Sequence, residues 1–131
     1  MHINIVIVVH TVPTPTVIIS PSGPIQGAMV GSPQVINCTV STVSGVESNS
    51  VMISWMGPGG GSIMNNSRVT ISPTTSSGNN YTSNLQFTYL MEGDEGTYIC
   101  NVTILATDAS QSVEIQPLIS KLSLTYITNF T

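Results

Sequence analysis

The stretch that decides the fold is "EGDEGTYIC", residues 92–100. It places Glu92, Asp94 and Glu95 beside two glycines, directly before an alternating Thr-Tyr-Ile-Cys run. The whole chain holds only six acidic residues, so half of them lie in this one turn. The cluster is either a chemical site, catalytic or metal-binding, or a structural corner that leads into a strand.

The flanking sequence has the pattern of strands. Alternating apolar and polar residues recur between clusters of Gly, Pro, Ser and Asn, and no stretch has helical periodicity. This pattern predicts an all-β sandwich or barrel. Both cysteines fall on predicted inward faces, whereas Asn37 and Asn101 fall outward. The predicted inward residues are Ile36, Cys38, Val40, Val51, Ile53, Trp55, Val69, Ile71, Leu85, Phe87, Tyr98, Cys100, Val102, Ile104, Val113 and Ile115, with Leu90 at a corner.

Charge excludes two classes of partner. Only 6% of the residues are charged, the net charge is −4, and Arg68 and Lys121 are the only fixed cations. Binding to nucleic acid, or to anionic lipid headgroups, needs a basic stripe that this chain lacks. No stretch approaches the ~20 apolar residues of a membrane span, so we expect no direct membrane insertion by this chain.

Glycan acceptors and cysteines favour the secretory pathway. Five Asn-x-Ser/Thr sequons are candidates for N-glycosylation, namely Asn37, Asn65, Asn80, Asn101 and Asn129. The two cysteines form no Cys-x-x-Cys pair, which argues against zinc and redox sites. An even cysteine count in a secreted domain favours one disulfide, the alternative being two buried free thiols.

The chain divides into three parts. Residues 1–15 comprise an apolar run, interrupted by Asn4, and the Pro/Thr linker "TVPTPT". The run is either a degenerate signal peptide or an extended strand from a preceding module. Residues 16–116 form the predicted domain, in which "GPGGG" (57–61) is a loop and 106–111 a hairpin connection. Residues 117–131 are a tail, a further strand or the start of another module.

One family carries this combination of residues. The order Cys38, Trp55, Cys100, together with "LQFTYLMEGDEGTYIC", resembles an immunoglobulin-superfamily domain. The resemblance implies a Greek-key β-sandwich of two antiparallel sheets, with Trp55 packed on a Cys38–Cys100 disulfide.

The resemblance extends to individual positions. Leu85, Phe87 and Leu90 match core positions of the family, and Asp94, Gly96, Tyr98 and Cys100 match its D-x-G-x-Y-x-C signature. It implies that Tyr98 forms the tyrosine corner and that Arg68 pairs with Asp94. The short connection after Trp55 leaves little room for the extra strand of variable-type domains, and no glycine bulge marks the last strand. An intermediate-type receptor or adhesion domain therefore fits best.

Chemical sites find little support in the sequence. His2 and His10 precede the domain, which offers no general base for a Ser or Cys nucleophile, so we expect no enzyme. Calcium needs six to eight oxygen ligands, and this turn offers a few carboxylates only. We expect neither metal nor cofactor. Outward Met52 and Met56 are a candidate binding face, unless a neighbouring strand or loop covers them. A glycan on Asn101 would shield part of the same sheet.

These observations predict an extracellular recognition or adhesion module. It would belong to a secreted protein or to the ectodomain of a membrane receptor or adhesion protein, and bind a protein or glycan partner without covalent chemistry. The alternative is a purely structural spacer in a modular ectodomain.

Overall fold

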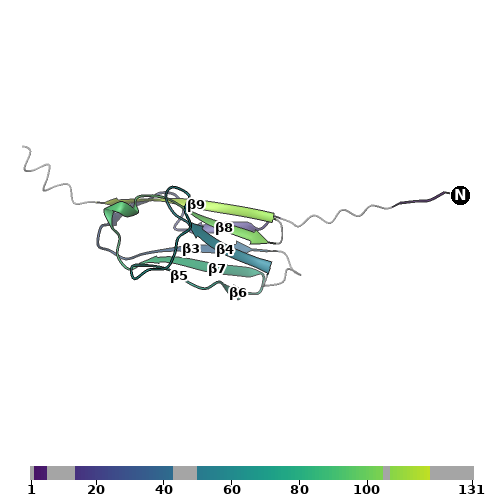
Figure 1. Cartoon of the computed structure of the whole chain (residues 1–131), viewed down its shortest axis with the longest axis horizontal. Helices are drawn as coiled ribbons and strands as arrows, with labels where there is room; N and C mark the ends of the chain where they lie inside the picture. Colours follow the sequence, from purple (N-terminus) through teal and green to yellow (C-terminus); the bar gives the residue numbers. More distant parts are fainter. Residues whose placement is uncertain (1, 6–13, 43–49, 105–106, 119–131) are drawn as a thin grey trace, which may run out of the picture.

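The computed structural model describes residues 2–5, 14–42, 50–104 and 107–118 of the chain. The regular structure of these residues is almost entirely strand, with a short 3-10 turn (Figure 1), and the predicted all-β fold is confirmed. The elements are β1 (Thr16–Ser20), β2 (Ile25–Met29), β3 (Gln34–Ser41), β4 (Val51–Met56), β5 (Val69–Ile71), β6 (Thr75–Ser77), β7 (Asn80–Phe87), the 3-10 turn η2 (Glu92–Asp94), β8 (Gly96–Ile104) and β9 (Thr107–Leu118).

The strands form two sheets that pack face to face. One sheet has the order β1-β3-β7-β5, with β6 also paired to β7, and the other has the order β2-β9-β8-β4. Every pairing is antiparallel except that of β2 with β9, which is parallel. In Figure 1 the strands run along the long axis, with η2 and the end of β9 at the same end of the sandwich.

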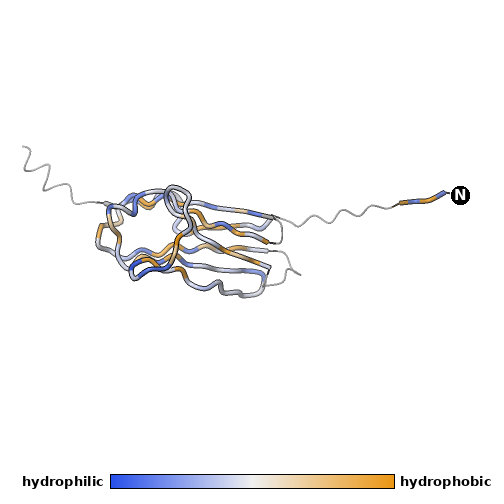
Figure 2. The backbone as a smooth tube through the Cα atoms, in the orientation of Figure 1, coloured by the Kyte–Doolittle hydropathy of each residue, from blue (hydrophilic) through white to orange (hydrophobic). Residues whose placement is uncertain are grey.

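The core lies between the sheets, where strand alternation predicts it. Hydrophobic and hydrophilic residues alternate along the strands (Figure 2), because successive side chains point to opposite faces. Burying one large apolar side chain contributes about 1.5–3 kcal/mol, so this core is the main source of stability. The core residues that are at most 1% exposed are Ile36, Cys38, Val40, Trp55, Leu85, Leu90, Cys100, Val102, Ile104 and Ile115.

The start of the domain contains a feature that the alternation did not predict. β1 pairs with β3 in one sheet, and β2 then pairs with β9 in the other. Pro21 and Pro24 lie between β1 and β2 and offer no N–H to a ladder, so the strand breaks there and the chain changes sheets. Val17 and Ile19 of β1 and Ile25 of β2 are all buried in the core.

The hairpin expected at 106–111 is present between β8 and β9, but residues 107–111 belong to a strand and not to the connection. β9 begins at Thr107, and its partners in β8 include Ile104 opposite Thr107 and Cys100 opposite Gln111. The polar residues there resembled a turn. They belong to a strand because one face of an antiparallel sheet accepts exposed polar side chains. The predictions that fall on residues 1, 6–13, 43–49, 105–106 and 119–131, including the acceptor Asn129, lie outside the described residues.

Candidate functional site

A disulfide joins the two sheets. Cys38 in β3 is bonded to Cys100 in β8, with Cα atoms 6.4 Å apart and a sequence separation of 62. Both cysteines are fully buried. The predicted disulfide is therefore confirmed, and the described residues hold no free cysteine.

The tryptophan beside this disulfide has a polar partner. Trp55 in β4 is 1% exposed, and its indole N–H donates a 3.0 Å hydrogen bond to Ser83 Oγ in β7. Ser83 is itself 1% exposed, so this bond satisfies two polar groups inside the core. One feature of the sequence indicates that Ser83 points inward. It lies between Tyr81 and Leu85 in the alternation of β7 and so shares their buried face.

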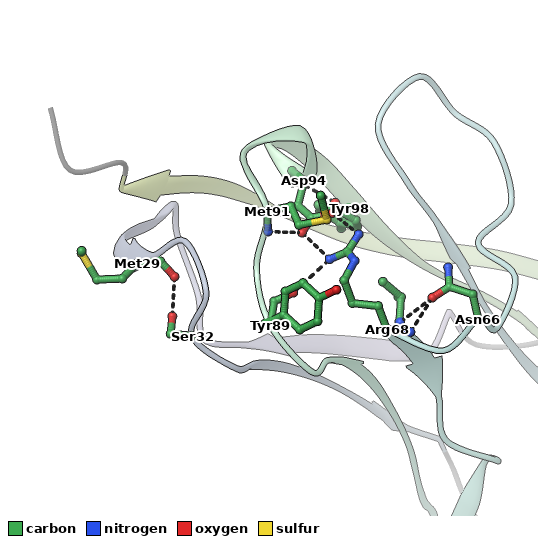
Figure 3. A network of polar contacts seen from close by, with 9 residues as sticks. Met29, Ser32, Asn66, Arg68, Tyr89, Met91, Asp94 and Tyr98 are labelled. Carbon is green, nitrogen blue, oxygen red and sulfur yellow. Dashed lines mark hydrogen bonds and ion pairs between the residues drawn. The ribbon is translucent and has the colours of Figure 1, made fainter. Parts of the chain in front are cut away.

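The acidic turn is a structural corner. Arg68 donates to both carboxylate oxygens of Asp94, at 2.6 and 2.8 Å, and to the carbonyl oxygen of Tyr89 at 3.0 Å (Figure 3). The Asp94 carboxylate also accepts the N–H of Met91 at 2.7 Å. The hydrogen bond that Arg68 donates to Asp94 raises the pKa of Arg68. Asp94 is buried and fully engaged in these bonds, whereas Glu92 and Glu95 are exposed.

Tyr98 holds the same corner from the other side. Its hydroxyl donates a 2.7 Å hydrogen bond to the carbonyl oxygen of Asp94 (Figure 3), and its ring meets Phe87 edge-on, with centroids 5.5 Å apart. Burial, with a smaller contribution from the nearby Asp94 charge, raises the pKa of Tyr98 to about 12. This arrangement has the geometry that the resemblance implied for a tyrosine corner.

Gly96 allows a close approach of two segments. Its φ is +143°, and a Cβ built on it would lie 2.5 Å from Cγ of Pro58. No side chain fits there without a shift of the loop that follows β4. Gly96 matches the family signature in the sequence, and the contact with Pro58 adds a steric reason for a glycine that the local sequence did not reveal.

Across residues 2–5, 14–42, 50–104 and 107–118, no three His, Cys, Asp or Glu side chains gather as a metal ion would require. No helix within these ranges is long and apolar enough to cross a membrane.

The outward face of β4, β8 and β9 is the other candidate site, and we call it the β4–β8–β9 face. Met52 is 68% exposed on it, and Met56 is half-buried opposite Ile99. Asn101 is half-buried at the centre, between Ser54 of β4 and Ser110 of β9. Ionisable side chains of this face come from β9 alone, namely Asp108 and Glu114.

The other acceptors lie elsewhere. Asn37 and Asn80 are exposed on β3 and β7 of the opposite sheet. Asn65 is exposed in the segment before β5, and its side-chain oxygen accepts the N–H of Ile71 at 2.7 Å.

Comparison with solved structures finds the same architecture repeatedly. A chain of the complex of Dpr2 Ig1-Ig2 with DIP-Theta Ig1-Ig3 superposes with a TM-score of 0.66 at 18% identity, over 79% of this chain and 32% of that one. The fold is immunoglobulin-like. A chain of the titin M10 and obscurin-like 1 Ig complex gives 0.61 at 19% identity, over 82% and 95% of the two chains. The C. elegans twitchin kinase fragment with immunoglobulin domains gives 0.59 at 16% identity, over 82% and 21%.

This immunoglobulin-like chain thus spans about a third, 32%, of the chain that it matches in the Dpr2–DIP-Theta complex. No protein-family model matches its sequence, and no curated protein matches it significantly. At these sequence identities the similarity establishes the fold alone. The function has to be inferred from the surface residues of this chain.

Proposed function

We propose that residues 16–116 form an extracellular recognition or adhesion module that binds a protein partner through the β4–β8–β9 face. The module has no catalytic role in this proposal. The observation that carries it is the exposure of Met52, which is 68% accessible on a face to which β4 and β8 contribute only uncharged residues.

The chemistry of the face supports protein binding. Exposed apolar side chains within a polar surround are typical of protein interaction sites, and flexible Met side chains adapt to varied partners. β4 and β8 contribute no charge, so a partner would not have to desolvate an ionised group over that part of the face. Two of the solved neighbours, those of Dpr2 and titin M10, come from protein–protein complexes.

The distribution of glycan acceptors also favours the β4–β8–β9 face as the binding site. Asn37 and Asn80 lie on the outward face of the other sheet, so glycans there would cover that sheet. The β4–β8–β9 face carries Asn101 only, and its side chain is half-buried between two strands.

The extracellular assignment rests on covalent chemistry. A buried disulfide persists in oxidising compartments, and exposed sequons are used only in the secretory pathway. The Cys38–Cys100 bond and the exposure of Asn37, Asn65 and Asn80 fit both conditions.

One observation favours the second candidate, a structural spacer. Asn101 lies at the centre of the proposed face, and a glycan attached there would stand between Ser54 and Ser110 and hinder a partner. Mapping glycan occupancy on secreted protein addresses this directly. A binding module predicts low occupancy at Asn101, whereas full occupancy there supports a spacer.

A glycan introduced onto the β4–β8–β9 face, which we call a glycan wedge, tests whether this face binds the partner. Ser110→Asn creates an acceptor on the face, because Ser112 lies two residues further on. A multivalent fusion of the secreted chain, presented to a panel of cells, should bind some of them, and this substitution should abolish that binding.

The matched control is Gln86→Asn, which creates an acceptor with Thr88 on the outward face of the other sheet. It should leave binding intact. Equal loss from both substitutions would move the site away from this face. Absence of binding to every cell type would overturn the recognition role in favour of the spacer.

A further inference from the structure

The free edges of the two sheets differ in how they are protected. An open edge strand presents unpaired backbone groups to other chains, and proteins blunt such edges with prolines, bulges, charges or short strands. β1 is flanked by Pro15 and Pro21. β2 follows Pro24 and carries a register shift between Gln26 and Met29. β5 and β6 are three residues long each. β4 has no proline, charge or register shift from Val51 to Met56.

The direction of the β4 backbone groups follows from the loop after it. The carbonyl oxygen of Trp55 accepts the N–H of Ile63 at 3.0 Å, on the side away from β8. Because backbone groups alternate sides along an antiparallel strand, Val51 and Ile53 also direct their N–H and C=O groups away from β8. Within the described part of the chain, no strand pairs with β4 along this edge before Trp55.

Side chains at this edge suit a second copy of the same chain. In a two-fold contact the residue on the axis meets its own counterpart, so a charge at that residue would oppose a like charge. The β4 side chains are all uncharged, and Met52 is 68% exposed. The loop segment at Ile63 occupies the edge beside Trp55, so pairing is confined to the start of β4.

We propose that two copies of this chain associate edge to edge through β4, antiparallel about a two-fold axis at Met52. Val51 of each copy then lies opposite Ile53 of the other, and both exchange N–H···O=C bonds. Met52 packs against Met52 of the second copy on the outward face. The two four-stranded sheets become one continuous sheet. This inference rests on the proposed recognition function and names one of its partners.

Edge pairing covers Met52 at the margin of the β4–β8–β9 face and leaves the part of the face over β8 and β9 open. Asn101 lies one strand in from the edge and its side chain projects from the face, so a glycan there does not block the contact. Self-association and binding of a different protein on the face are therefore separable. The contact is small, so we expect it to be weak and dependent on concentration.

Sedimentation equilibrium of the glycosylated, secreted chain tests the proposal, over about 10 µM to about 1 mM. We expect the weight-average mass to rise toward twice that of the monomer. Met52→Lys and Met52→Glu should each weaken association at least about tenfold, because like charges then face each other across the axis. An equimolar mixture of these two variants should restore association, since a lysine on one chain then faces a glutamate on the other.

The control is Ile18→Lys, which adds the same charge to a 55% exposed residue on β1, the edge of the other sheet. It should leave association unchanged. A chain that stays monomeric at every concentration overturns the proposal, as does association that Ile18→Lys abolishes and Met52→Lys does not. The Ser110→Asn wedge should not affect self-association, so a failure here is distinct from a failure of the proposed face.

Discussion

Trp55 and Ser83 connect the two sheets directly beside the disulfide. Trp55 is the cross-strand neighbour of Cys100 in one sheet, and Ser83 is the neighbour of Cys38 in the other. The hydrogen bond from the indole to Ser83 Oγ therefore runs alongside the covalent bond between the cysteines. The centre of the domain is held at two adjacent points, one covalent and one polar.

Ser83→Ala should destabilise the domain, because it leaves the indole N–H of Trp55 buried without a partner. We expect a loss of about 1–3 kcal/mol in the free energy of unfolding. Urea denaturation followed by the fluorescence of Trp55, the only tryptophan, measures it. Ser76→Ala is the control on exposed β6 and should change the free energy by less than about 0.5 kcal/mol. Equal effects from both would contradict a role for this bond.

Replacing both Cys38 and Cys100 by Ala should lower the free energy of unfolding by roughly 4 kcal/mol, because the bond closes a loop of 62 residues in the unfolded chain. Non-reducing peptide mapping of the native protein should recover the two cysteine peptides linked. Two free thiols in secreted material would refute both the bond and the extracellular assignment.

Asp94→Asn should cost about 2–4 kcal/mol, because Arg68 keeps its charge and loses a carboxylate that binds it through both oxygens. Combined with Arg68→Met, the loss should be smaller than the sum of the single losses, since the residues act as one unit. Glu95→Gln, an exposed acid one residue away, serves as the control. Additive losses in chemical denaturation would show that the two side chains act independently.

Tyr98 should make the domain sensitive to alkali. Its pKa in the folded state is about 12, above the ordinary value of 10.0, so the folded protein holds the phenolic proton more tightly than the unfolded chain. The resulting stability, about 2–3 kcal/mol, is fully present below pH ~10 and is lost as the pH rises toward ~12. Denaturation at a series of pH values should show this decline, and Tyr98→Phe should flatten it. A slope unaffected by that substitution would assign the alkaline loss to other groups.

Gly96→Ala should destabilise the domain by about 2 kcal/mol or more, since an Ala there combines a positive φ with a clash against Pro58. Gly93→Ala is a matched control three residues earlier, where a Cβ meets nothing within 4 Å. Thermal unfolding of the two variants compares them. If both variants unfold at the same temperature, the close approach of Pro58 to Gly96 does not constrain the residue at position 96 in solution.

Strand alternation was enough to predict the core, whereas the corner was predicted from the resemblance to immunoglobulin-superfamily domains. Cys38, Trp55, Leu85 and Cys100 follow a period of two, and the assigned faces match the burial of these residues. The acidic turn could be interpreted because its partners, Arg68 and Tyr98, are distinctive residue types in a chain with few charges.

Other features depend on contacts between distant segments, which periodicity does not encode. Nothing local links Gly96 to Pro58, or selects Ser83 as the partner of Trp55. The change of sheet between β1 and β2 is set by the position of β9, which comes almost a hundred residues later. The open edge of β4 likewise became visible only once the order of strands was known.

The parallel pairing of β2 with β9 has a mechanical consequence. Ile25 lies opposite Ile115 and Gln26 opposite Gln116, and both strands run in the same direction. A force that pulls the start of β2 away from the end of β9 acts along the strands. The force loads the hydrogen bonds between the two strands in shear. All of these bonds therefore bear the force together and do not break one after another.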